Sequence, residues 1–301
     1  PVQAATGTAP PPPRPDAAVQ TAVVVPPPPP PVAVVPPQAS DSPLATPDPA
    51  LLEPSRYGML PRRGPDGRMP YQAYAQPYRR SDYRPRIGLI IADSGAFESY
   101  SEDMLRRLPT QVAIAISPYS PYAEAMAARA RERGMEVLLG LPLEPAGFPL
   151  NDPGHRALLT ARSPADNADN LQWALSRFRG YVGVIGALGP MRGERFAQQP
   201  DQLRRVHDSL RERGLLYIDP RPGTPTTDRV WGRTVDIVLD EPPTRIEIER
   251  RLSELDTIAR LRGSAVAYAG TLSPSLVDRL AGWWAGLEAR GLLLAPVSSL
   301  L

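Results

Sequence analysis

The sequence predicts an α/β fold in which a mostly parallel sheet closes into a (β/α) barrel of about eight strands. Three observations support this prediction. Apolar runs of strand length alternate with helical patterns from residue 86 to residue 301. The strand runs are continuously apolar, which is expected when both faces of each strand are covered. The composition also changes at residue 86, since 23 of the 40 prolines precede it.

The expected strands are short runs rich in Val, Ile, Leu and Ala. They lie at residues 87–92, 112–116, 136–141, 182–185, 215–218, 235–239, 265–269 and 292–296. Most should run parallel, because a helical segment separates most consecutive pairs. An open, doubly wound sheet is the alternative architecture. No Gly-rich phosphate loop follows the first strand, which argues against a nucleotide-binding fold.

The expected helices begin and end at recognisable residues. Ser163 is a typical N-cap, and Pro164 suits the first helical position. Gly134, Gly214 and Gly291 follow helical patterns, where a glycine commonly ends a helix. The helices are expected at residues 98–107, 122–134, 163–178, 201–214, 244–262 and 274–290.

Three regions follow from composition. Residues 1–55 are expected to be a disordered, proline-rich tether, and residues 56–85 a linker or an arm packed on the domain. Residues 86–301 form the barrel domain. The proline runs at 10–13 and 26–31 favour an extended polyproline helix. We interpret this helix as a spacer. The alternative is a ligand for an aromatic groove on a partner protein.

Composition excludes several classes of function. The absence of Cys excludes disulfides, Cys-based zinc sites and Cys nucleophiles. The formal net charge is only +2 and the charges are interleaved, so no nucleic-acid partner is expected. No apolar run approaches the roughly 18 residues of a membrane span. Because the chain begins with Pro1, we expect a processed product whose signal or anchor was removed.

Acidic residues follow four of the expected strands. Asp93, Glu144, Asp219 and Asp240 would all lie at the rim where barrel enzymes place their chemistry. Each alone could equally cap a segment or hold a loop. Together they predict a shared acidic site with Asp93, Glu144 and Asp219 as catalytic candidates. Such a site could bind a divalent cation such as calcium or magnesium.

Other residues are candidates for the same rim. We predict that Arg221, Asp240 and Tyr119 contribute to binding there. His155 is expected in a loop and His207 within a helix. Neither histidine follows a strand, so both are interpreted as surface or packing residues.

Several motifs resemble the divergent polysaccharide deacetylase family, which is related to other carbohydrate esterases. The sequence IGLIIADSG is similar to the family's opening strand, which ends in Asp-Asp-x-Gly. LPLEP resembles the family's Leu-Pro-Met-Glu-Pro, DPR its Asp-Ser-Arg, and PVS its closing Pro-Val-Ser. The matching segments keep the family order and lie at residues 87–95, 108–119, 128–145, 213–221 and 292–298. The resemblance implies a barrel of the glycoside hydrolase and deacetylase type.

The chain departs from the family at three positions. In related deacetylases the first strand supplies an Asp base and an Asp metal ligand, but here Ala92 replaces the first and only Asp93 remains. Ala187 and Gly270 stand where the family has histidines. Alanine and glycine offer no lone pair to a metal or a proton. The resemblance therefore implies a lost metal site, with Asp93 as the single weak candidate ligand, and no resident cofactor.

These observations leave three hypotheses for function. The preferred one is a catalytically degenerate domain of the bacterial periplasm or cell envelope that binds a glycan, such as peptidoglycan, or a protein partner. The first alternative is an active polysaccharide deacetylase that uses the acidic site. The second is a scaffold that recruits an envelope protein through its proline-rich arm. The envelope location is an implication of the family resemblance.

Overall fold

The protein is described here by a computed structural model that defines residues 7, 44–78, 81–93, 95 and 98–301. The predicted polyproline runs, and most of the predicted tether, lie outside the described residues. Within the described parts of the chain, no helix is both long and apolar enough to cross a membrane.

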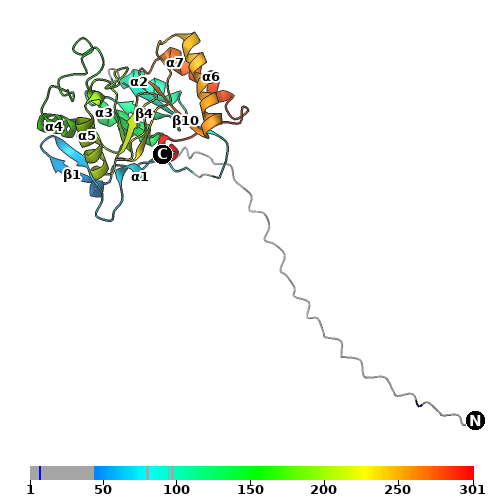
Figure 1. Ribbon diagram of the computed structural model, residues 1–301, viewed down its shortest axis with the longest axis horizontal. Coiled ribbons are helices and arrows are strands. Elements are labelled where there is room, and N and C mark those ends of the chain that lie inside the picture. The colour runs from blue at the N-terminus through cyan, green and yellow to red at the C-terminus, as the bar shows by residue number, and fades with distance from the viewer. Residues whose placement is uncertain (1–6, 8–43, 79–80, 94, 96–97) are drawn as a thin grey trace, which may run out of the picture. The chain divides into compact units, whose positions relative to one another are not determined.

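A parallel sheet forms the centre of the domain (Figure 1). Its hydrogen-bonded order is β8-β7-β6-β5-β4-β3-β10-β9, and β11 pairs with the start of β3. Every pairing in this sheet is parallel. The strands are β3 (Arg86–Asp93), β4 (Ala113–Ile116), β5 (Val137–Gly140), β6 (Gly183–Ile185), β7 (Leu216–Asp219), β8 (Gly232–Thr234), β9 (Ile237–Val238), β10 (Ser264–Ala269) and β11 (Leu293–Leu294).

The two end strands of this order, β8 and β9, belong to one stretch of chain. Between them, the Val235 N–H donates to the Asp219 carbonyl of β7 at 2.9 Å, and the Asp236 N–H donates to the Val266 carbonyl of β10 at 2.8 Å. Because successive N–H groups of a strand point to opposite sides, this stretch lies between β7 and β10. It links the ends of the sheet into a barrel-like arrangement, so the predicted fold class is confirmed.

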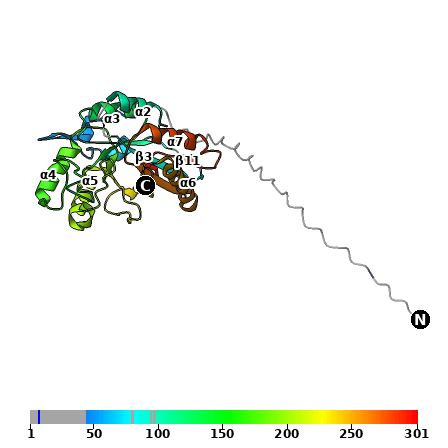
Figure 2. The same cartoon turned by 90° about the horizontal axis from the view of Figure 1, so that it is seen from above.

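In the described part of the chain, six longer helices lie around the strands. Figure 2 shows this arrangement from above. The predicted N-cap Ser163 accepts a hydrogen bond from the Asp166 N–H at 3.1 Å. Gly214 ends its helix with φ +71°, a conformation that glycine adopts without strain. The helices are α2 (Glu98–Arg106), α3 (Ala123–Glu132), α4 (Pro164–Leu175), α5 (Pro200–Arg213), α6 (Arg245–Arg262) and α7 (Pro274–Ala285).

Two hydrophobic cores explain the continuously apolar strands. In β3, Ile87, Leu89 and Ile91 pack in the core between the strands and the helices. Ile90 and Ala92 alternate with them and belong to a second core inside the barrel. Both faces of the strand are therefore buried, as the sequence pattern predicted.

An N-terminal arm packs against the barrel, and the boundary drawn at residue 55 differs from the structure. The arm comprises η1 (Pro49–Leu51), the antiparallel pair β1 (Leu52–Ser55) and β2 (Gly58–Pro61), and α1 (Pro70–Ala73). Leu44, Leu51 and Leu52 are buried, and Leu51 joins the inner core. Apolar burial thus orders residues 44–55, which the proline content had assigned to the tether.

Several shorter elements and element ends also differ from prediction. β8 was missed, because Gly232–Thr234 is polar and half-buried. The last helix ends at Ala285 rather than at residue 290. The final predicted strand contains only Leu293–Leu294, and η3 (Val297–Leu300) follows it. Short elements at the edges of a sheet carry the weakest periodic pattern.

Candidate functional site

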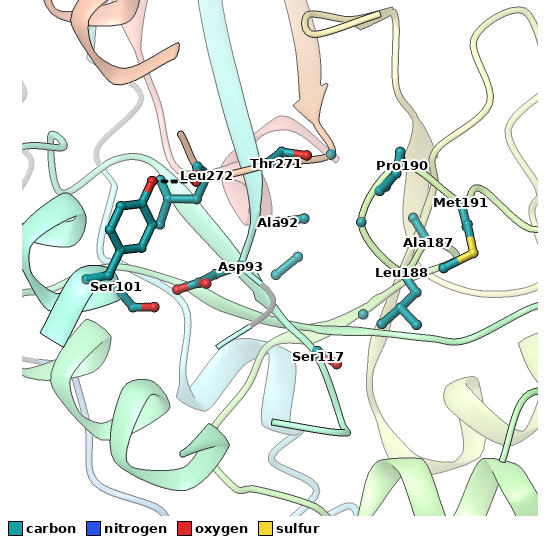
Figure 3. Close-up of a pocket in the computed structure, with 15 residues that line it drawn as sticks. Ala92, Asp93, Ser101, Ser117, Ala187, Leu188, Pro190, Met191, Thr271 and Leu272 are labelled. Carbon is teal, nitrogen blue, oxygen red and sulfur yellow. Dashed lines mark hydrogen bonds between the residues drawn. The ribbon is translucent and has the colours of Figure 1, made fainter. Parts of the chain in front are cut away.

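A cavity of about 430 Å³ opens at the carboxyl ends of the barrel strands (Figure 3). We call it the main cavity because it lies where barrel enzymes place their active sites. The ends of β3 and β4 form one part of its wall, together with the first turn of α2. The turns that follow β6 and β10 form the other part. The lining residues are Ala92, Asp93, Tyr100, Ser101, Ala115, Ser117, Gly140, Ala187, Leu188, Gly189, Pro190, Met191, Gly270, Thr271 and Leu272.

The three positions that depart from the family motif meet in this cavity. Ala92, Ala187 and Gly270 come from three separate parts of the chain, and all line the same space as Asp93. The resemblance had matched these positions one by one from sequence. The fold now brings them together, at the place where a barrel collects residues from different strand ends.

Asp93 is the acidic residue of the cavity. Its side chain is only 5% exposed, and its Oδ1 accepts a hydrogen bond from the Gly95 N–H at 2.9 Å. Burial raises the pKa of the Asp93 carboxyl, while hydrogen bonding from Gly95 and Ser101 acts in the opposite direction. Among the described residues, no hydrogen bond of regular geometry reaches its Oδ2. In Figure 3 the carboxylate points towards Ser101, with Ala187, Leu188 and Pro190 on the other side.

The turn after β6 crowds Gly270, the position where the family resemblance implies a histidine. A Cβ atom at this position would lie 2.9 Å from both the Cα and the N of Pro190. Those are backbone atoms, which cannot swing aside as a side chain would. The Tyr268 hydroxyl also donates to the Gly189 carbonyl at 2.6 Å, which fixes this turn against β10. A side chain at this position would therefore require the turn to move.

The residues present do not fit the metal site that the fold family implies. Asp93 supplies one carboxylate, and Ala92, Ala187 and Gly270 supply no ligand atom. In the described part of the chain, no group of three or more His, Cys, Asp and Glu residues could hold a metal ion. The expectation of a shared acidic site, with a divalent cation at its centre, is therefore wrong.

Glu144 holds loops together instead of facing the cavity. Its buried carboxylate pairs with the Arg195 Nε at 3.0 Å and accepts a hydrogen bond from the Thr160 N–H. Its carbonyl oxygen also accepts hydrogen bonds from the Arg195 and Phe196 N–H groups. All of these partners anchor the turns beyond β5, so Glu144 has a structural role.

Asp219 and Arg221 bind each other away from the main cavity. Arg221 donates from its Nε to Asp219 Oδ1 at 2.9 Å and from its Nη2 to Oδ2 at 2.5 Å. Tyr217 belongs to the outer core, and Asp219 lies two residues later on the same face of β7. The pair therefore lines a separate cavity of about 130 Å³, which also includes His207.

Asp240 supports the wall of the main cavity. Its two carboxylate oxygens accept hydrogen bonds from the Gly270 and Thr271 N–H groups, both at 2.9 Å. Burial raises its pKa, and these hydrogen bonds act against that shift. Asp240 thus shapes the turn after β10 and does not itself line the cavity.

Tyr119 belongs to an aromatic cluster outside the main cavity. Its ring centroid lies 5.1 Å from that of Trp173 and 5.5 Å from that of His155. Burial raises the pKa of the Tyr119 hydroxyl to about 12, so it stays neutral as it accepts a hydrogen bond from the Arg156 N–H. His155 is exposed, whereas His207 is buried against Tyr217. Neither histidine lines the main cavity.

Sequence reasoning missed most of the cavity wall. Tyr100 donates its hydroxyl hydrogen bond to the Leu272 carbonyl at 3.1 Å and so joins α2 to the turn after β10. Leu188, Pro190 and Met191 form the apolar side. In the sequence, only their position after the strand β6 could have indicated Leu188, Pro190 and Met191. They are apolar and match no catalytic motif.

Sequence comparisons relate this chain to one protein family and to two bacterial proteins. Residues 89–301 match the family described as divergent polysaccharide deacetylase. An uncharacterised protein of Haemophilus influenzae is 24% identical over 190 residues, which are 60% of this chain and 65% of that protein. The uncharacterised protein YibQ of Escherichia coli is 24% identical over 191 residues, 60% of this chain and 57% of YibQ. The chain thus spans less than two thirds of either relative.

A solved structure supports the fold. The uncharacterised protein ATU2773 from Agrobacterium tumefaciens superposes with a TM-score of 0.72 and 27% sequence identity, covering 81% of this chain and 100% of that one. The family match begins in β3 and runs through the last residue, so it includes all the residues that line the cavity. By this match over most of its length, the chain belongs to the divergent polysaccharide deacetylase family.

Proposed function

We propose that this protein is a catalytically inactive member of its family that binds a polysaccharide of the bacterial cell envelope in the main cavity. The observation that carries the proposal is that the Pro190 backbone lies too close to Gly270 to leave room for a side chain. A histidine side chain there would collide with the Pro190 backbone, so the missing ligand reflects the shape of the turn as well as one residue identity.

The chemistry of deacetylation supports the same view. Hydrolysis of an acetamide requires a nucleophilic water, which a metal ion or a well-placed base supplies. Asp93 is the carboxylate that lines the cavity, and Ala92 replaces the family's base. The alternative, an active acidic site, would also require Glu144 and Asp219 in the cavity. Arg195 and Arg221 bind their carboxylates elsewhere.

The cavity is suited to binding. Its volume of about 430 Å³ lies within the range of ligand sites, which are mostly apolar with a few convergent polar groups. Tyr100 is 37% exposed and offers an aromatic face, while Ser117 and Thr271 offer hydroxyl groups. Sugars are bound by this combination of ring faces and hydrogen-bonding groups.

An envelope location is part of the proposal. The family is described by its action on polysaccharide, and the proline-rich composition before residue 44 suits a spacer between an anchor and a glycan layer. Fractionation of cells that produce the full-length protein would test this part separately.

Retention on insoluble peptidoglycan tests the proposal. We expect the unmodified chain to be retained, and Ala187→Leu, which adds bulk inside the cavity, to lose about tenfold or more in affinity. Ala285→Leu makes the same change at an exposed position at the end of α7 and should bind normally. Absence of retention, or equal retention of both variants, would reject the cavity as a glycan site.

A further inference from the structure

We propose that the main cavity selects an amino sugar with a free amine, whose ammonium group pairs with Asp93. This inference rests on the proposed function and makes it more specific, since it distinguishes a glycan that has lost its acetyl group from one that retains it.

Asp93 differs from the other buried carboxyl groups in its hydrogen bonding. Glu136 accepts hydrogen bonds from the Gln76 N–H, the Ser298 N–H and the Ser298 hydroxyl. Asp240 uses both oxygens for the N–H groups at Gly270 and Thr271. Asp93 accepts a hydrogen bond from Gly95 at Oδ1, and Ser101 also contributes hydrogen bonding to the carboxyl. No hydrogen bond of regular geometry from a described residue reaches Oδ2. The Asp93 carboxylate, which lines the main cavity, can therefore accept a further hydrogen bond.

Asp93 also lacks a positive partner within the described part of the chain. The buried or nearly buried acids Glu144, Asp219 and Asp236 each pair with an arginine. No ion pair of Asp93 with a described residue is found, and its pKa is shifted by burial and by hydrogen bonding from Gly95 and Ser101. A buried carboxylate without a counter-charge is costly, so a ligand that brings a positive charge gains the energy of pairing.

The rest of the cavity strengthens such a pair. Leu188, Pro190 and Met191 form an apolar wall, and charges attract each other more strongly where water is excluded. The cavity has room for a sugar ring beyond the ammonium group, with the Ser117 and Thr271 hydroxyls available to its hydroxyl groups. An acetamide offers one neutral N–H and leaves the charge of Asp93 uncompensated.

Titration calorimetry with two matched tetrasaccharides tests the inference on the full chain. One is the tetramer of N-acetylglucosamine, and the other is its fully deacetylated form. Both are measured at about pH 6, because the ring oxygens of an amino sugar lower the pKa of its amine well below that of a lysine. We expect the deacetylated tetramer to bind at least about tenfold more tightly. Asp93→Asn keeps the shape and the acceptor for Gly95, and should abolish this preference. Asp201→Asn removes an exposed carboxylate on α5 and should retain it.

Each outcome has one meaning. Equal or tighter binding of the acetylated tetramer by the unmodified chain overturns the inference but leaves the proposed function standing. Failure of both tetramers to bind rejects both. Binding of trilysine as tightly as the deacetylated tetramer would show that any amine suffices and would overturn the assignment to a sugar. The comparison of tetramers on the unmodified chain remains decisive even where Asp93→Asn fails to fold.

Discussion

Glu136 joins three distant stretches of the chain at the start of β5. Its buried carboxyl accepts hydrogen bonds from Gln76 in the arm and from the backbone and hydroxyl of Ser298 near the end of the chain. Burial raises its pKa, and these hydrogen bonds oppose the shift. Two motifs that resemble the family, one around Glu136 and one ending in Ser298, therefore meet in a single structural contact.

Replacement of Glu136 should destabilise the fold. Glu136→Ala leaves buried donors on Gln76 and Ser298 without an acceptor, at a cost of about 1–3 kcal/mol each. We expect the free energy of unfolding, measured in urea, to fall by about 3 kcal/mol or more. Glu132→Ala, at an exposed position on α3, is the matched control and should change little. A Glu136→Ala protein that unfolds at the same urea concentration as the unmodified protein would contradict this role.

His207 should make stability depend on pH. Burial lowers its pKa from 6.5 to about 4, with Asp219 and Asp208 opposing the shift and Arg221 and Arg229 adding to it. Between these pH values the unfolded state binds a proton that the folded state does not, so stability falls as pH decreases from 6.5 to 4. The shift corresponds to a loss on the order of 3 kcal/mol.

The variant His207→Phe isolates this contribution, because it keeps an aromatic ring beside Tyr217 and removes the titrating group. Urea midpoints of both proteins at about pH 7 and pH 4.5 provide the measurement. The variant should lose less stability than the unmodified protein on acidification. Parallel losses in the two proteins would show that His207 is not responsible.

At the scale of residues, the sequence predicted which residues occupy the motif positions better than it predicted where their side chains point. The matches of Ala92, Ala187 and Gly270 needed only the order of motifs, and these positions do meet at one cavity. The acidic rim failed because strand alternation turns Asp219 outwards, where Arg221 binds its carboxylate. Arg195 binds the carboxylate of Glu144. Arg195 comes from a part of the chain far from Glu144, so local pattern could not reveal that pair, whereas Arg221 lies only two residues after Asp219.

At the scale of elements, the turn Gly189–Pro190 determines what β10 can carry at its end. A Cβ on Gly270 would meet that turn, whereas a Cβ on Gly282 in α7 would meet no atom within 4 Å. We therefore expect Gly270→Ala to destabilise the fold by about 1–3 kcal/mol. Gly282→Ala should stabilise it by about 1 kcal/mol, since alanine favours a helix interior.

Thermal unfolding of the two glycine variants gives the comparison directly, because each adds one methyl group. Opposite shifts in melting temperature are expected. If both substitutions raise the melting temperature, the turn can move away from Gly270, and the argument against a histidine at that position fails.

Long elements with a clear period were predictable, and short ones were not. The 18-residue helix α6 lies within the expected range 244–262, and in the structure Thr244 caps its start and Gly263 follows its end. The four-residue strands β1 and β2 and the four-residue helix α1 were missed in a proline-rich region. Their order comes from burial of residues such as Leu51 against the barrel, which is a tertiary effect.

At the scale of the whole molecule, the fold does not depend on a catalytic centre. One core lies between strands and helices and the other inside the barrel, and together they include most of the buried apolar residues. Burial of this kind dominates folding energetics. This agrees with the proposed inactive member, in which Ala92, Ala187 and Gly270 line a cavity available for binding while the two cores maintain the scaffold.

The most direct test of this account is the release of acetate from the N-acetylglucosamine tetramer, measured on the full chain with excess zinc. The account predicts no release above the rate without protein, because the cavity supplies one carboxylate and no imidazole. Acetate release that proceeds with turnover and disappears in Asp93→Asn would contradict it.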